Sequence, residues 1–192
     1  MTELNRIPRG SEELALRGYD GARALVGARG ACVHLTIESM LPVGLDAVVH
    51  EQDTAGVLCG ADRLDPPRSS YRRLIAAMLS QRPARPGAVV VREGRPLRMH
   101  AIVHDLDCDP SWSAAAIAAA LELIVGAARE RALASLALPP LGAMHGRFPV
   151  PEFVALLRAA LARNAVPSLR DLWLYADAAQ LPALHAALRA PG

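Results

Sequence analysis

The sequence contains no lysine, and all 21 of its basic residues are arginine. The arginine bias and an abundance of alanine run along the whole chain, which indicates GC-rich codon usage rather than selection for bidentate anion contacts. Aromatic residues make up only 4% of the 192 residues, whereas 52% are hydrophobic. The core must therefore consist mainly of Ala, Leu, Val and Ile, and the length suits one domain, or one domain with a short extension.

Cysteines and long apolar runs are also scarce. Cys32, Cys59 and Cys108 are far apart and form no CxxC pair, which argues against a disulfide framework and against a zinc site. The N-terminal residues contain no apolar run of the secretory type. The apolar stretch at 114–128 is interrupted by Glu122 and is too short to span a bilayer. We therefore expect a reducing, cytoplasmic setting and no membrane partner.

Positive charge is concentrated in one part of a chain whose net charge is only +2. Nine arginines lie between Arg63 and Arg98, against Asp65 and Glu93. This stretch is interpreted either as a positive surface for an anionic partner or as a solvated helix face and loop. Tyr71 is the only aromatic residue nearby that could stack on a base. The sequence therefore predicts no nucleic-acid partner.

Strand-like and helix-like segments alternate from residue 31 onward. Short apolar runs rich in β-branched residues predict strands at 31–37, 45–50, 88–91, 98–105, 135–138 and 169–176. Apolar residues at helical spacing predict helices at 70–79, 113–133, 151–163 and 180–188. Two helix-like pieces separated by Gly18 predict that residues 1–30 form an extension packed on the domain. The alternation predicts a sheet covered by helices on both faces.

The segment 135–149 joins a buried strand to a helix through a loop rich in proline and glycine. Gly142 and Gly146 let the backbone approach a ligand and expose N–H groups, and the helix start behind them adds partial positive charge. These features favour a cradle for a diphosphate, although a ligand-free connection has the same composition. The predicted ligand-binding residues of this loop are Leu141, Gly142, Ala143, Met144, His145, Gly146 and Arg147.

The order of these segments resembles that of the macro-domain family, whose members bind ADP-ribose. Pro139, Gly142 and Gly146 match the family's Pro-x-x-Gly-x-x-x-Gly loop, and residues 45–49 are similar to its strand Asp-Ala-Ile-Val. The resemblance implies an α/β fold, a three-layer α/β/α sandwich with a central mixed sheet, in residues 31–192. It also implies that this divergent member binds ADP-ribose or a related nucleotide diphosphate, with ADP-ribosylated protein as a further partner.

The catalytic-loop positions depart from the family pattern. Residues 50–53 are His-Glu-Gln-Asp where the family has Asn-Ala-Ala-Asn, and the triple glycine is reduced to Gly56 and Gly60. We predict that Gly56 and Gly60 contact the ligand. We also predict that Glu51 or Asp53, at the end of a strand, positions a water or acts as a general base. An ADP-ribosyl hydrolase and a ligand-free scaffold for protein interaction stay open as alternatives to a binding module.

A run of potential metal ligands follows the strand predicted at 98–105. His104, Asp105, Asp107 and Asp109 offer ligands in near alternation, as a hard cation would require. A polar strand end followed by an Asp-Pro turn explains the same residues without an ion. We therefore predict neither a metal site nor a cofactor.

Overall fold

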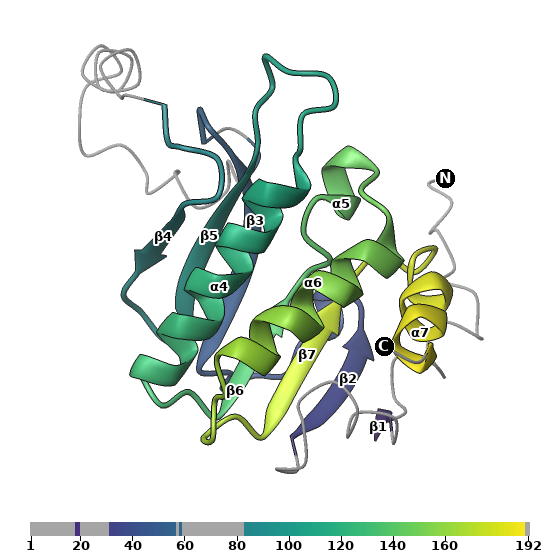
Figure 1. The fold of residues 1–192 in the computed structure, drawn as a ribbon. Helices are drawn as coiled ribbons and strands as arrows, with labels where there is room; N and C mark the ends of the chain where they lie inside the picture. The colour runs from purple at the N-terminus through teal and green to yellow at the C-terminus, as the bar shows by residue number, and fades with distance from the viewer. Residues whose placement is uncertain (1–17, 20–30, 57, 59–82, 191–192) are drawn as a thin grey trace, which may run out of the picture.

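A seven-stranded sheet forms the centre of the computed structural model, which describes residues 18–19, 31–56, 58 and 83–190 (Figure 1). The strand order is β1-β2-β7-β6-β3-β5-β4. β1 and β4 run antiparallel to their neighbours and all other pairs are parallel, so the sheet is mixed, as predicted. The strands are β1 (Gly18–Tyr19), β2 (Cys32–Thr36), β3 (Ala47–Asp53), β4 (Val89–Arg92), β5 (Leu97–His104), β6 (Ser135–Leu138) and β7 (Asp171–Tyr175).

Three longer helices pack against one face of this sheet. The helical elements are the 3-10 turn η2 (Glu38–Met40), α4 (Ala114–Glu130), α5 (Ala143–Gly146), α6 (Val150–Arg163) and α7 (Leu181–Arg189). α4, α6 and α7 share one apolar core with the strands, and α4 and α6 lie side by side (Figure 1). The helix predicted at 70–79 lies outside the described residues. Within the described ranges, no helix has both the length and the apolar character needed to cross a bilayer.

The α4 helix shows how the sequence builds this core. Ser113 caps the helix, because its hydroxyl accepts a hydrogen bond from the Ala116 N–H at 3.1 Å. Ile117, Leu121 and Ile124 recur at helical spacing and are fully buried. Each such side chain contributes about 1.5–3 kcal/mol through the apolar area that it removes from water. The helix therefore covers the sheet with aliphatic residues alone.

The alternation of side chains along β3 decides where its carboxylates lie. Ala47 and Val49 face the core beneath the helices, whereas Val48 packs against Tyr175 on the opposite face. Because successive side chains of a strand alternate between faces, Glu51 and Asp53 continue the row of Ala47 and Val49. Both carboxylates are consequently buried at the end of the core face.

Most elements predicted from residue 31 onward are confirmed, with shifted ends. β3 extends three residues beyond its predicted end at His50, because the strand keeps pairing with β5 as far as Asp53. Gly18, the predicted break between two helix-like pieces, begins β1, which pairs with β2. The other residues of the predicted extension, 1–17 and 20–30, lie outside the described part of the chain. η2 and α5 are too short to produce a periodic pattern.

Candidate functional site

The pairing between β3 and β6 stops before the carboxyl ends of these strands. These neighbouring strands pair only at Ala47–Leu136 and Val48–Ala137, whereas β3 continues along β5. At the opposite, amino end, the Asp46 carboxylate accepts the N–H groups of Ala134 and Ser135 at 2.7 and 2.9 Å. The β3–β6 pair is therefore held by hydrogen bonds at its amino end and is unpaired at its carboxyl end.

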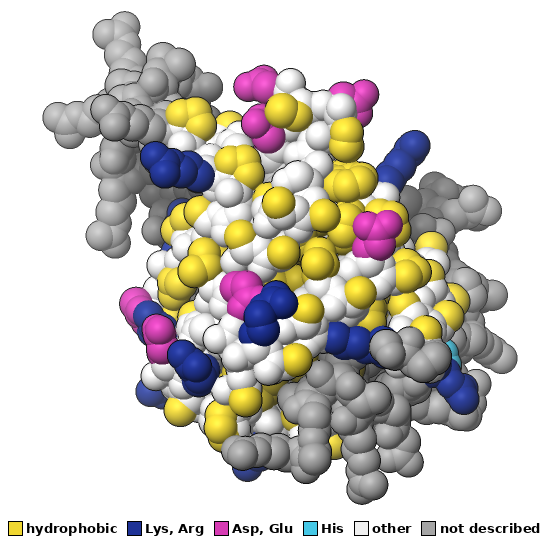
Figure 2. Space-filling view, in the orientation of Figure 1, with side chains coloured by type: hydrophobic (Ala, Val, Ile, Leu, Met, Phe, Trp, Pro, Cys, Tyr) yellow, Lys and Arg dark blue, Asp and Glu magenta, His cyan; other side chains and the backbone are white. Residues whose placement is uncertain are grey.

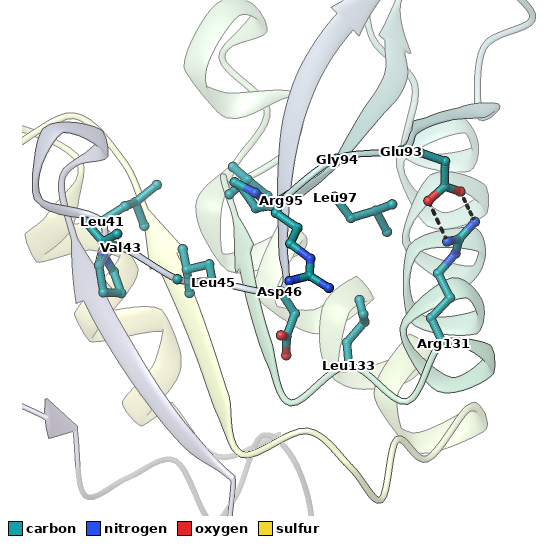
Figure 3. Close-up of a pocket in the computed structure, with 14 residues that line it drawn as sticks. Leu41, Val43, Leu45, Asp46, Glu93, Gly94, Arg95, Leu97, Arg131 and Leu133 are labelled. Carbon is teal, nitrogen blue, oxygen red and sulfur yellow. Dashed lines mark hydrogen bonds and ion pairs between the residues drawn. The ribbon is translucent and has the colours of Figure 1, made fainter.

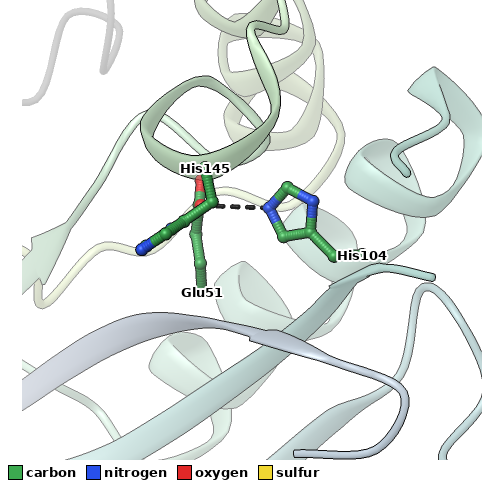
Figure 4. A group of neighbouring side chains, drawn as sticks. All are labelled: Glu51, His104 and His145. Carbon is green, nitrogen blue, oxygen red and sulfur yellow. Dashed lines mark hydrogen bonds and ion pairs between the residues drawn. The ribbon is translucent and has the colours of Figure 1, made fainter. Parts of the chain in front are cut away.

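The Glu51 side chain connects the end of β3 to the loop that follows β6. Its Oε1 accepts the backbone N–H of Gly142 at 2.5 Å, in the loop that follows β6. Its Oε2 is hydrogen-bonded to Nε2 of His104 at 3.1 Å and to Nδ1 of His145 at 2.8 Å. Figure 4 shows the three side chains pointing toward one another. A buried carboxylate therefore links the ends of β3 and β5 to α5.

The two histidines differ in their exposure. The side chain of His104 is completely buried, and its Nδ1 lies 3.1 Å from the Ser111 hydroxyl. The side chain of His145 is 43% exposed. The two rings meet edge to face, with their centroids 6.1 Å apart. One histidine is thus fixed inside the protein, and the other connects the group to solvent.

The surroundings shift the pKa values of Glu51 and His145 in opposite directions. Burial raises the pKa of Glu51, but hydrogen bonds and charge interactions with His104 and His145 outweigh it and hold this pKa below its usual value. The hydrogen bond to Glu51 raises the pKa of His145, although partial burial opposes it, and Asp177 and Glu38 act in the same direction as Glu51. The pair therefore favours a carboxylate beside an imidazolium.

Gly142 and Gly146 are required by close packing around this group. Gly142 has φ +80°, and a Cβ there would lie 2.6 Å from Cδ1 of Ile117. A Cβ on Gly146 would overlap the Trp112 ring and approach Cε1 of His104 to 2.7 Å. The sequence interpretation assigned both glycines to the approach of a ligand. The structure shows a packing role for both glycines and a hydrogen bond from the Gly142 N–H to Glu51, whereas ligand contact stays a prediction.

Trp112 fastens the loop after β5 to the loop after β6. Its indole N–H donates a hydrogen bond to the carbonyl oxygen of Gly146. Its ring also meets that of Phe148 edge to face, with centroids 5.0 Å apart. On the other side, the Gln180 amide donates to the carbonyl oxygen of Ala143 at 3.0 Å. The loop that carries His145 is therefore anchored at several points.

Asp53 organises the loop that follows β3. Its two carboxylate oxygens accept the N–H groups of Ala55 and Leu58 at 2.6 and 2.8 Å. Gly56 lies within this turn at φ +71° and donates its N–H to the Asp53 carbonyl oxygen. Gly60 lies outside the described residues. A catalytic role for Asp53 stays a prediction, whereas its contribution to loop geometry is visible.

The predicted loop after β6 divides into buried and exposed parts. Leu141 and Ala143 are buried, so their side chains belong to the core. Met144 is half-buried against the cluster on the opposite face of the sheet. Arg147 is exposed and adopts a left-handed backbone conformation with φ 59°. The structure therefore brings Glu51, Gly142 and His145 together, and leaves Arg147 as the accessible cation of the loop.

The partnership of His104 with Glu51 was not predicted. His104 was grouped with the acidic run that follows it, but Asp105 instead accepts the Asp107 N–H at 3.2 Å within its own loop. Figure 2 shows acidic side chains gathered at this end of the molecule. One sequence signal could have indicated this partnership. Side chains alternate along β3, so Glu51 lies on the same face as the core residue Val49, and a carboxylate buried there needs hydrogen-bond partners.

A separate pocket opens at the opposite end of the sheet, where the parallel strands begin (Figure 3). Its volume is about 820 Å³, and Leu45, Leu97 and Leu133 form part of its wall. At its rim, Arg131 and Glu93 form two hydrogen bonds of 2.8 and 3.2 Å. Both side chains are exposed, so this ion pair adds little to stability. None of the predicted site residues lines this pocket.

Solved structures of macro domains share this arrangement. A variant of the Oceanobacillus iheyensis macrodomain matches with a TM-score of 0.60 and 15% identity, over 83% of this chain and 92% of that one. The macrodomain of Thermus aquaticus DarG matches with a TM-score of 0.57 and 23% identity, over 77% of this chain and 99% of that one. The Trypanosoma brucei macrodomain, solved in complex with ADP, matches with a TM-score of 0.60 and 15% identity, over 90% and 74%.

Comparison with family models finds no match, and neither does comparison with curated protein sequences. The structural matches nevertheless agree in topology and cover most of the chain. The resemblance seen in the order of the sequence motifs is therefore confirmed at the level of architecture: this chain has the macro-domain fold.

Proposed function

We propose that this chain binds ADP-ribose or a related nucleoside diphosphate in the crevice between the loops that follow β3 and β6. The observation that carries the proposal is the reversal of strand order at this pair. The chain passes from β3 to β4 and β5 on one side and from β6 to β7 on the other, so it leaves this strand pair in opposite directions. In open α/β sheets, such a reversal creates the crevice in which ligands bind.

The similar structures support this ligand class. The O. iheyensis macrodomain has been solved with ADP, a mutant of it with ADPR, and the T. brucei macrodomain with ADP. Both ligands contain adenosine joined to a diphosphate, and ADPR carries a second ribose on the terminal phosphate. The same ADP-ribose group attached to a protein is a second source of this ligand chemistry.

Arg147 is the side chain of the loop best suited to meet a phosphate. It is exposed in the loop after β6, and a guanidinium can donate two hydrogen bonds to one phosphate group. The Asp53 carboxylate holds the N–H groups of Ala55 and Leu58, at the start of the segment that follows β3. Backbone groups that are held in place before a ligand arrives lose less entropy on binding.

Glu51 and Asp53 give no specific support to hydrolysis. Asp53 holds the amides of its own loop, and Glu51 is buried among three hydrogen-bond donors. Binding is therefore the function that we put forward. Hydrolysis and a ligand-free interaction scaffold are outcomes that the experiments below would reveal.

Calorimetric titration of the full chain with ADP-ribose, ADP and AMP tests the proposal. The diagnostic variant is Arg147→Asn, because asparagine tolerates the left-handed backbone that Arg147 adopts. A matched control is Arg129→Asn, an exposed arginine in the last turn of α4. We expect micromolar binding of ADP-ribose that Arg147→Asn weakens by about tenfold or more, as loss of a charge-assisted hydrogen bond implies. Arg129→Asn should bind like the unmodified chain.

Absence of any heat signal from a folded protein would overturn the proposal and favour the scaffold. Equal affinities of the two arginine variants would remove the role given to Arg147. Incubation with mono-ADP-ribosylated protein separates binding from hydrolysis, because only a hydrolase releases free ADP-ribose. Substitutions at Gly142 are unsuitable for this test, since an added Cβ meets the Ile117 side chain in the core.

A further inference from the structure

Glu51, His104 and His145 place three metal-ligating atoms within 4.8 Å of one another, a grouping that stands out among the described residues. They come from three separate segments: the end of β3, the end of β5 and the short helix α5. We infer that these side chains form a binding site for one divalent transition-metal ion, and that Zn²⁺ is the ion that fits best. The inference does not depend on nucleotide binding.

The donor set selects the class of ion. Two imidazole nitrogens and one carboxylate oxygen suit zinc and the neighbouring transition metals. Calcium and magnesium prefer shells made wholly of oxygen atoms. The carboxylate contributes one negative charge against the two positive charges of the ion. The site with its ion therefore has a net charge of +1, which favours an anion or a water as a further ligand.

The spacing of the donors is close to that of a zinc site. With zinc–ligand bonds of about 2.0–2.1 Å, two ligand atoms of a tetrahedral site are about 3.3 Å apart. Oε2 of Glu51 lies 3.1 Å from Nε2 of His104 and 2.8 Å from Nδ1 of His145. These two separations need to grow by only a few tenths of an ångström. The two ring nitrogens lie within 4.8 Å of each other, and the half-exposed His145 is the group with room to move.

Two further contacts hold the ligands in place. The Gly142 N–H binds Oε1 of Glu51 and leaves Oε2 directed at the histidines. The Ser111 hydroxyl lies 3.1 Å from Nδ1 of His104. Because a hydroxyl oxygen accepts hydrogen bonds, Ser111 can accept the Nδ1–H of His104 when Nε2 offers its lone pair to an ion. Such outer contacts orient the ligands of protein metal sites and raise their affinity.

The number of ligands and their exposure indicate an open coordination position. Three protein ligands leave a fourth position for water or substrate, as in catalytic zinc sites, whereas structural sites are closed by four. The side chain of His104 is 0% exposed and that of His145 is 43% exposed. An ion would therefore enter, and bind a further ligand, on the side of α5.

Cobalt and zinc titrations of the full chain, after treatment with a chelator, test this inference. Co²⁺ reports its coordination through its visible absorption, and Zn²⁺ affinity follows from its displacement of Co²⁺. The diagnostic variants are His145→Ala, which removes a half-exposed ligand, and Glu51→Gln. The matched control is His34→Ala, because His34 also contacts a carboxylate, that of Asp171 at 2.9 Å, outside the group.

We expect one ion per chain, with the absorption of four-coordinate Co²⁺. His145→Ala should weaken binding by at least about a hundredfold, and Ser111→Ala by about 10–100-fold, the range seen when an outer contact is lost. His34→Ala should bind as the unmodified chain does. Circular dichroism of each variant establishes that it is folded. If Glu51→Gln fails to fold, His145→Ala still tests the inference, because the His145 side chain is half-exposed.

Two results would overturn the inference: no stoichiometric binding by the folded chain, or equal affinity of the unmodified chain and His145→Ala. The second result would mean that the ion binds elsewhere. ADP-ribose binding measured on the chelator-treated chain separates this inference from the proposed function. A protein that binds the nucleotide but no metal would refute the metal site alone.

Discussion

Replacing Glu51 with alanine should destabilise the metal-free fold by about 2–6 kcal/mol. The change removes the acceptor of two buried donors, the Gly142 N–H and the His104 ring nitrogen. Each buried donor left without a partner costs about 1–3 kcal/mol. The half-exposed His145 can turn to water, so its lost hydrogen bond adds little.

Glu51→Gln is the matched control for this prediction. The glutamine side chain keeps an oxygen for the Gly142 N–H. Its amide N–H can donate to Nε2 of His104 if the ring proton moves to Nδ1, beside the Ser111 hydroxyl, so that both buried groups keep a partner and the charge is lost. We expect it to cost about 1 kcal/mol, the difference between a charge-assisted and a neutral hydrogen bond. Comparing alanine with glutamine therefore separates the satisfaction of buried donors from the charge itself.

Urea unfolding in the presence of a chelator, followed by circular dichroism and tryptophan fluorescence, measures both changes. The slope of the unfolding free energy with urea must match that of the unmodified chain for the comparison to hold. A loss below about 1 kcal/mol for Glu51→Ala would refute the reasoning, because the two donors would then have found other partners. A glutamine variant as unstable as the alanine variant would also refute it.

Three further predictions concern stability. Gly142→Ala should cost about 2–5 kcal/mol in urea unfolding, because a left-handed residue gains a Cβ that also meets Ile117; an unchanged midpoint would contradict this. Ser113→Ala should cost about 1 kcal/mol through loss of the α4 cap, with a matching fall in Tm. In metal-free protein, the Glu51–His145 pair should stabilise the fold most between pH 4.5 and 6.5. The lowered pKa of Glu51 means that its contribution is present above 4.5 and is lost as pH falls through its folded pKa. The raised pKa of His145 means that its contribution is present below 6.5 and is lost as pH rises through its folded pKa. His145→Ala should abolish the alkaline loss.

The order and type of most elements from residue 31 onward could be predicted from the sequence, because their signals are local. The strand at 135–138 was predicted with its observed bounds, since its apolar run ends at a proline pair. The end of β3 was missed by three residues. Glu51, Gln52 and Asp53 are polar, yet they belong to the strand because β5 continues beside them. Pairing with a strand that is distant in the sequence cannot be recognised from the local residues.

The candidate site was predicted only in part. The loop after β6 was identified from its glycines, and Glu51 and His145 were both named as candidates. Their contact with each other was not predictable, because 94 positions separate them and the meeting depends on how β6 departs from β3. His104 was read with its sequence neighbours, although its buried partner belongs to another strand. Sequence spacing can indicate ligands that lie on the same helix or strand. Glu51, His104 and His145 each lie on a different element, so no spacing connects them.

The fastening of β3 and β6 by Asp46 has a consequence for how the protein opens locally. The hydrogen bonds at the amino end lie at the surface, whereas the Gly142 N–H at the carboxyl end is bonded to a buried carboxylate. Surface hydrogen bonds can open without disturbing the core, so the amides of Ala134 and Ser135 should exchange through local opening. Amide hydrogen exchange at Gly142 should be slower and should report the state of the Glu51 group.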